Sequence, residues 1–194
     1  MSVLHHQKGY SLVEVLVATA ILLIATVGPL TIAAKGIQTA QFAREQATAT
    51  FLAQEGVEAV VALRNSSIIQ ALDDGDLSTS WDWQTGTPGI DRCFPARGIS
   101  NGCNMDFNNA NVANPIRACN APANCALRYD VTTNIPYTAN GSGAASPYMR
   151  VITLENTGPK EVRITSTVYW DSSLYRGGTL EQVAFSSTVF SLYE

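Results

Sequence analysis

The longest apolar run in the chain lies near its N-terminus. From Tyr10 to Ala34 it reads YSLVEVLVATAILLIATVGPLTIAA, about 25 residues and long enough to cross a bilayer as a helix. Lys8 and Lys35 flank the run, and Glu14 is the single charge inside it. A carboxylate in lipid costs roughly 2.5–3.5 kcal/mol at mid-helix and less near an interface, so Glu14 is a functional candidate.

The helical pattern continues beyond this run to about Asn65. The continuation holds no proline and is rich in Ala, Gln and Glu, which favour helices. Its apolar residues recur at three- and four-residue spacing and predict one stripe: Ala49, Leu52, Ala53, Gly56, Val60 and Leu63. The pattern therefore predicts one helix that is apolar all round over residues 10–34 and amphipathic over residues 35–65.

Strand patterns occupy residues 148–194, the C-terminal part of a head that begins near residue 66. Residues 148–155 and 161–170 are rich in β-branched and aromatic side chains and are separated by a turn. Residues 179–193 alternate again, with Val183, Phe185 and Val189 as apolar positions. We expect an antiparallel sheet of these three strands, with residues 127–133 as a candidate fourth, resting on the helix stripe. This is an α+β fold.

The part of the head between helix and sheet, residues 66–147, is irregular and contains all four cysteines: Cys93, Cys103, Cys119 and Cys125. An even number of cysteines beyond an apolar span predicts disulfides in an oxidising compartment. Three pairings exist, and closure of short loops favours Cys93–Cys103 with Cys119–Cys125. A zinc site is disfavoured because paired cysteine knuckles are absent.

Two other features of residues 66–147 have competing interpretations. Asp73, Asp74 and Asp76 offer calcium ligands, but no glutamate follows at EF-hand spacing, which favours a solvated turn. Trp81 and Trp83 would share one face of an extended segment, where core packing is favoured over a carbohydrate platform.

Composition and charge narrow the possible chemistry. The 194 residues carry a net charge of −4, which argues against nucleic acid as a partner. The two histidines, His5 and His6, precede the apolar run, so the rest of the chain lacks His-based nucleophile systems and His-ligated metals. A carboxylate pair such as Asp82 with Asp91 is the remaining route to an enzyme. We expect no catalytic residue, no cofactor and no metal.

The start of the apolar run carries a specific motif. Lys8-Gly9-Tyr10-Ser11-Leu12-Val13-Glu14 resembles the class III signal of type IV prepilins and pseudopilins. In that family a short basic leader ends in glycine, an aromatic residue opens the mature chain, and a glutamate follows four residues later. The continuation to Leu22 is most similar to minor pilins of the PilV type and to small pseudopilins. A cleaved secretory signal fits less well because Glu14 interrupts its core, and a plain anchor leaves Glu14 unexplained.

The resemblance implies a processing and assembly route. Residues 1–9 would be the leader, removed by a prepilin peptidase after Gly9, and Tyr10 would then be N-methylated. Glu14 would pair with the new amino group, in the family's usual account that of a neighbouring subunit. The two groups are about one turn apart within one helix, so a pair inside the subunit is also open.

The resemblance also implies the function. The chain would be a structural subunit, a minor pilin, of a type IV pilus, and not an enzyme. Its partners would be other pilin or pseudopilin subunits, the prepilin peptidase, an inner-membrane assembly platform, and membrane lipid before assembly. It would cross the cytoplasmic membrane once with its head outside the cytoplasm, then enter an extracellular or periplasmic filament. The alternatives are a pseudopilin of a type II secretion or competence system, and a membrane-anchored extracytoplasmic binding module or hydrolase.

Gly28 and Pro29 are the expected helix break. Proline removes one helical hydrogen bond and clashes with the preceding turn, and glycine lowers helix propensity. Two interpretations stay open: a modest kink tolerated in a membrane helix, or a segment that unwinds when the subunit leaves the bilayer and enters a filament.

Overall fold

The computed structural model describes residues 11–105, 116–129, 137–139, 143–172 and 180–191, without the side chain of Trp81. The predicted leader and Tyr10 lie outside these residues. The chain divides into two compact units, Met1–Ala43 and Arg44–Glu194. The first unit contributes only helix to the described residues, and the second contains the remainder of that helix together with the sheet.

The helix α1 runs from Leu12 to Asp73, eight residues beyond the end expected near Asn65. Residues 66–72 contain neither glycine nor proline, so nothing in them stops the helix. The helix stops just before Gly75, whose φ of 70° is readily adopted only by glycine. The Gly75 N–H donates to Leu72 O at 3.3 Å and the Asp76 N–H to Ala71 O at 3.0 Å, which is a Schellman motif.

Short helical turns connect α1 to the sheet: η1 (Leu77–Trp81), α2 (Trp83–Gly86), η2 (Ile90–Cys93), η3 (Pro95–Arg97) and, between β2 and β3, η4 (Pro122–Cys125). Asp76 caps η1, where its Oδ1 accepts hydrogen bonds from the Ser78 N–H at 3.0 Å and the Ser78 hydroxyl at 2.6 Å. These bonds hold the pKa of Asp76 below its usual value. The tryptophan segment is helical rather than extended, and Trp83 is buried in the core.

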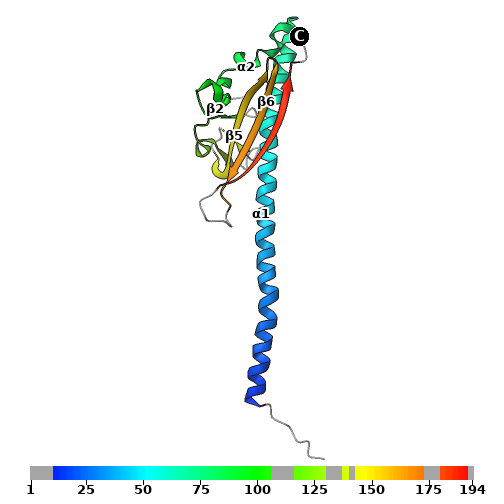
Figure 1. Ribbon diagram of the computed structural model, residues 1–194, viewed down its shortest axis with the longest axis vertical. Coiled ribbons are helices and arrows are strands. Elements are labelled where there is room, and N and C mark those ends of the chain that lie inside the picture. The colour runs from blue at the N-terminus through cyan, green and yellow to red at the C-terminus, as the bar shows by residue number, and fades with distance from the viewer. Residues whose placement is uncertain (1–10, 106–115, 130–136, 140–142, 173–179, 192–194) are drawn as a thin grey trace, which may run out of the picture. The chain divides into compact units, whose positions relative to one another are not determined.

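The described strands form one antiparallel sheet: β1 (Cys103–Met105), β2 (Ile116–Ala118), β3 (Ala126–Tyr129), β4 (Tyr137–Thr138), β5 (Ala144–Gly158), β6 (Glu161–Trp170) and β7 (Glu181–Phe190). The long β5 pairs with β6 on one side and with β1 and β3 on the other. β6 pairs in turn with β7, and Figure 1 shows these strands beside α1. The three predicted strands correspond to β5, β6 and β7, and the candidate fourth to β3.

The core lies between this sheet and the part of α1 that belongs to the second unit. The predicted stripe is buried except for Leu63, which is partly buried. From β6 the inward face is the predicted one: Val162, Ile164, Val168 and Trp170. On β7, which pairs with β6 alone among the described strands, Val189 is buried whereas Phe185, the neighbouring apolar position of the predicted pattern, is 41% exposed. The fold is thus a long helix packed on a C-terminal antiparallel sheet, an α+β fold of the pilin type.

Two disulfides staple the region between helix and sheet. Cys93 pairs with Cys103 at a Cα–Cα distance of 4.6 Å, and Cys119 pairs with Cys125 at 5.7 Å. This is the pairing that the loop-closure argument favours. The first bridge ties η2 to β1, and the second closes the connection that contains η4, so both constrain segments with little regular structure.

Candidate functional site

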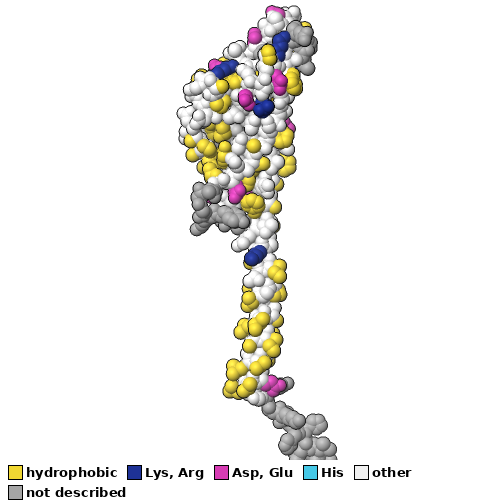
Figure 2. All heavy atoms as spheres, viewed as in Figure 1, with side chains coloured by type: hydrophobic (Ala, Val, Ile, Leu, Met, Phe, Trp, Pro, Cys, Tyr) yellow, Lys and Arg dark blue, Asp and Glu magenta, His cyan; other side chains and the backbone are white. Residues whose placement is uncertain are grey.

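The first part of α1 exposes apolar side chains in every direction. Every residue from Ser11 to Gln41 is exposed, including Leu12 at 76% and Leu30 at 71%. Figure 2 shows apolar side chains along this part of the helix. Among the described residues, α1 is the one helix long and apolar enough to cross a membrane. A surface of this kind needs lipid or protein to cover it.

The threonine hydroxyls of residues 11–34 are satisfied within the helix itself. Three threonine hydroxyls donate to carbonyl groups about one turn back: Thr19 to Leu16 O at 3.0 Å, Thr26 to Leu22 O at 3.1 Å, and Thr31 to Gly28 O at 2.7 Å. Because hydrocarbon offers no hydrogen-bond partners, such internal bonds are what a lipid-exposed helix requires. The segment therefore suits an apolar environment despite its threonines.

Glu14 lies in the first turn of α1 and is exposed. The Ser11 carbonyl accepts the first helical hydrogen bond, from the Val15 N–H at 3.2 Å, so Ser11 holds the N-cap position. Ser11 and Glu14 thus have the S-x-x-E spacing of a capping box, and the helix dipole favours a carboxylate there. Glu14 therefore has a local reason to be acidic in addition to the predicted pair with the Tyr10 amine, which lies outside the described residues.

The helix α1 continues without interruption through Gly28 and Pro29, where the sequence predicts a break. Pro29 has no N–H, so the Ala25 carbonyl loses its helical partner. The hydrogen bond from Thr31 to the Gly28 carbonyl stabilises the turn around the proline. No atom from elsewhere in the described chain approaches the space beside Gly28 within 4 Å. Unwinding of this segment during assembly stays a prediction.

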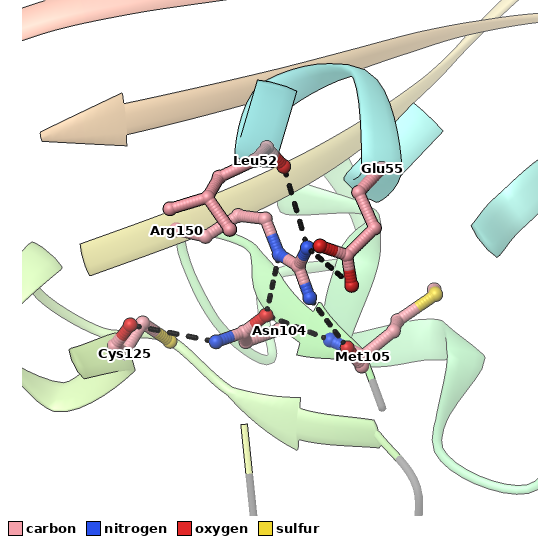
Figure 3. Close-up of polar contacts among 6 residues, drawn as sticks. All are labelled: Leu52, Glu55, Asn104, Met105, Cys125 and Arg150. Carbon is pink, nitrogen blue, oxygen red and sulfur yellow. Dashed lines mark hydrogen bonds and ion pairs between the residues drawn. The ribbon is translucent and has the colours of Figure 1, made fainter. Parts of the chain in front are cut away.

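A buried arginine fastens the second part of α1 to the sheet (Figure 3). Arg150, on β5, is 2% exposed, and its guanidinium lies between the helix and β1. It donates to Leu52 O at 3.3 Å, to Asn104 Oδ1 at 3.1 Å and to Met105 O at 2.8 Å. Glu55 Oε1 lies 3.4 Å from Nη1. One side chain therefore connects the helix, β5 and β1, and the sequence analysis missed it.

Gly56 allows the close approach of helix and sheet beside this arginine. A Cβ at Gly56 would lie 2.3 Å from Ser166 Oγ and 3.0 Å from Arg150 Cδ. The glycine, which costs helix propensity, is thus required by packing against β5 and β6. Its place in the predicted stripe is explained by this contact.

Three tyrosines form a cluster near the start of the head helix, by which we mean the part of α1 in the second unit, residues 44–73. Tyr137 packs against Tyr129 and Tyr148 with ring centroids 5.2 and 5.6 Å apart, and the Tyr148 hydroxyl donates to Glu45 O at 3.4 Å. Burial raises the pKa of both Tyr137 and Tyr148. The cluster thus favours neutral phenols.

The outer face of the head helix exposes two large apolar side chains. Phe51 is 70% exposed, Ile69 is 62% exposed, and Ala62 between them is exposed as well. These residues are about three and two helical turns apart, so they share one face, opposite the buried stripe, and the exposed Glu58 lies on the same face between Phe51 and Ala62. Like the first part of α1, this face is available to another molecule.

The two aspartates that offered an enzymatic interpretation lie in the connection between α1 and the sheet. Asp91 forms an ion pair with Arg97, whose guanidinium lies 4.1 Å from the centroid of the Phe94 ring. Asp82 lies between η1 and α2, where its carbonyl accepts from the Gly86 N–H at 2.6 Å. These contacts give both aspartates a place in the connection between α1 and the sheet.

Comparison with known families identifies the N-terminal segment. Residues 4–28 match the prokaryotic N-terminal methylation motif, the class III prepilin signal of type IV pilins. No curated protein and no solved structure matches the chain. The matched range contains the predicted cleavage site, Glu14 and Gly28, and it supports a type IV pilin or pseudopilin. The type IV pilin family is structural rather than enzymatic, and a pilin with this signal has pilin subunits and the prepilin peptidase as partners.

Proposed function

We propose that this chain is a minor pilin: a structural, non-enzymatic subunit of a type IV pilus, of the PilV type. It is held in the cytoplasmic membrane by residues 10–34 with its head outside the cytoplasm. A prepilin peptidase removes residues 1–9 after Gly9, Tyr10 is N-methylated, and an inner-membrane assembly platform transfers the subunit from lipid into the filament.

One observation carries this proposal. The first part of α1, which begins inside the methylation motif, exposes apolar side chains in every direction, with Glu14 as its one charge between Ser11 and Ala34. Lipid covers such a surface before assembly, and helices of other subunits can cover it afterwards. On the head helix, the exposed side chains of Phe51 and Ile69 offer further apolar contacts to another subunit.

Mass spectrometry of the mature N-terminus tests the processing step. The expected product begins at Tyr10 and carries one methyl group on its α-amino nitrogen. An intact Met1, or a chain that begins after Ala33, would contradict the proposal in favour of an anchored module or a cleaved secretory signal.

The location of the filament tests the finer assignment. Cells are sheared, and the chain is quantified by antibody in the released filaments and in the membranes. Recovery with surface filaments at a small fraction of the main subunit is the expected result for a minor pilin. Processed chain confined to a periplasmic filament would assign it to a pseudopilus of a secretion or competence system.

A further inference from the structure

A half-open cavity of about 320 Å³ lies on the surface of the head, and none of its lining residues belongs to α1. Its walls come from β2, η4, β3 and β5. Alanines supply much of its lining, so small side chains leave the space open: Ala118, Ala123, Ala126 and Ala145. The Cys119–Cys125 disulfide closes the loop that contributes the η4 wall. The wall is thus covalently held in place.

Two arginines line this cavity, and both are oriented by the backbone. Arg117 Nη1 donates to Ala139 O at 3.1 Å, and Arg128 Nη1 donates to Gly143 O at 3.1 Å. Each bond occupies one nitrogen of a guanidinium that has five N–H donors, so most donors stay available to a ligand. Because these side chains are already ordered, binding a ligand costs less conformational entropy.

The charge of the side chains that line the cavity indicates which class of ligand it can bind. Among the described residues that line the cavity, both charged side chains are cationic, and Asn124 adds an amide donor. The chain as a whole is acidic, with a net charge of −4, so this pair departs from its overall charge. Guanidinium groups bind phosphate through paired hydrogen bonds, and two of them match a phosphate dianion in charge. A volume of about 320 Å³ exceeds the share of about ten water molecules, which leaves room for a group esterified to the phosphate.

We propose that this cavity binds a small phosphate monoester, with Arg117 and Arg128 holding the phosphate and the alanine-lined wall accommodating the attached group. The ligand is either a free metabolite or a phosphorylated lipid headgroup, because both present the same chemistry. The site does not depend on the proposed function, since it uses neither α1 nor the methylation motif.

Calorimetry on the full chain in a non-ionic, phosphate-free detergent tests the proposal. Glycerol phosphate and inorganic phosphate are titrated separately at constant ionic strength. We expect saturable binding at one site per chain, weakened about tenfold by Arg117→Gln and by Arg128→Gln. Tighter binding of glycerol phosphate than of inorganic phosphate supports the proposal, and equal binding would overturn the role given to the alanine-lined wall.

Two further variants separate the site from general charge and from misfolding. Ala145→Phe fills the cavity without changing charge and should abolish binding. Arg163→Gln removes the same charge from an exposed position on β6 and should leave binding unchanged. Each variant must unfold at the temperature of the parent chain for the comparison to count as support. The proposal would be overturned if no saturable binding is found, if Arg163→Gln loses binding as much as the two arginine variants, or if Ala145→Phe still binds. It would also be overturned if an oligodeoxynucleotide, titrated in the same way, were the only phosphate compound to bind.

Discussion

Glu14 and Arg150 are charged side chains in apolar surroundings, and the protein accommodates them in different ways. Arg150 is buried, yet three hydrogen bonds and Glu55 surround its guanidinium. Glu14 is exposed on an apolar helix, where its local support is the helix N-terminus. A buried charge with complete partners can be structural, whereas a charge that lipid would disfavour calls for a partner supplied later.

Replacing Arg150 should destabilise the head strongly. Arg150→Met keeps much of the side-chain volume but removes the hydrogen bonds to the Met105 carbonyl and to Asn104 Oδ1, which retains the Met105 N–H, so we expect a loss of about 3 kcal/mol. Glu55 is more exposed, and Glu55→Gln should cost less than about 1 kcal/mol. Denaturant unfolding of the full chain in detergent measures both. Similar effects of the two variants would show that the ion pair, rather than the hydrogen bonds, carries the stability.

Glu14 variants separate capping from assembly. Glu14→Ala should leave membrane insertion and cleavage after Gly9 intact, because it removes a charge from the span and leaves the leader unchanged. Its incorporation into filaments should fall about tenfold or more, as expected for a lost charge pair in a low dielectric. Glu14→Gln is the matched control, since glutamine can still complete a capping box but carries no charge.

The readout for Glu14 is the ratio of the chain in sheared filaments to the chain in membranes. If the charge matters, both variants lower this ratio. If capping is the whole role, Glu14→Gln assembles like the parent. An unchanged ratio in both variants would mean that Glu14 has no assembly role.

At the scale of elements, α1 and β6 could be predicted because their periodicity is carried by neighbouring residues. The helix stripe from Ala49 to Val60 is buried as expected. The burial of Arg150 could not be predicted, although alternation along β5 places this residue on the inward face with Tyr148 and Ile152. A charged side chain is expected at the surface, and the residues that bind this one lie on β1 and α1, far away in the sequence. The end of α1 was also missed, because it depends on the backbone conformation of Gly75 rather than on a change of pattern.

Adding a methyl group at Gly56 should separate the helix from the sheet. In an exposed helix, Gly→Ala gains up to about 1 kcal/mol, but here the new Cβ meets Ser166 Oγ. We expect Gly56→Ala to destabilise the chain by about 1–3 kcal/mol in denaturant unfolding. Gly36→Ala, where the new Cβ would meet no atom within 4 Å from elsewhere in the described chain, is the control and should not destabilise. Combining Gly56→Ala with Ser166→Gly should recover part of the loss, and full additivity of the two changes would contradict the contact.

The tyrosine cluster should make the head sensitive to alkali. The pKa values of Tyr137 and Tyr148 are raised in the folded state by burial, whereas the unfolded tyrosines ionise near pH 10. The stabilisation is therefore complete below about pH 10 and is lost as the pH rises toward the folded values. Ultraviolet titration of phenolate, followed by unfolding across the same range, checks this. Tyr137→Phe should reduce the alkaline loss, and an equal loss in that variant would remove Tyr137 from the explanation.

At the scale of the whole molecule, the two units differ in what their sequences make predictable. The first unit is defined by composition and a short motif, so its helix and its signal could both be predicted from the sequence. The second unit depends on contacts between distant segments, such as the arginine-lined cavity formed by β2, η4, β3 and β5. No local pattern brings Arg117 and Arg128 together; the disulfide loop between them does.

Blocking cleavage of the leader should stop filament assembly at an earlier stage than replacing Glu14. Gly9→Arg replaces the residue before the scissile bond, so we expect an uncut precursor that still inserts into the membrane, because residues 10–34 are unchanged. Glu14→Ala should instead give a cut chain that stays in the membrane. Gel mobility separates the two products by the mass of the leader, and shearing should release neither with filaments. Incorporation of the uncut Gly9→Arg chain into filaments would show that assembly does not need the free amino group, which would also remove the basis for its pair with Glu14.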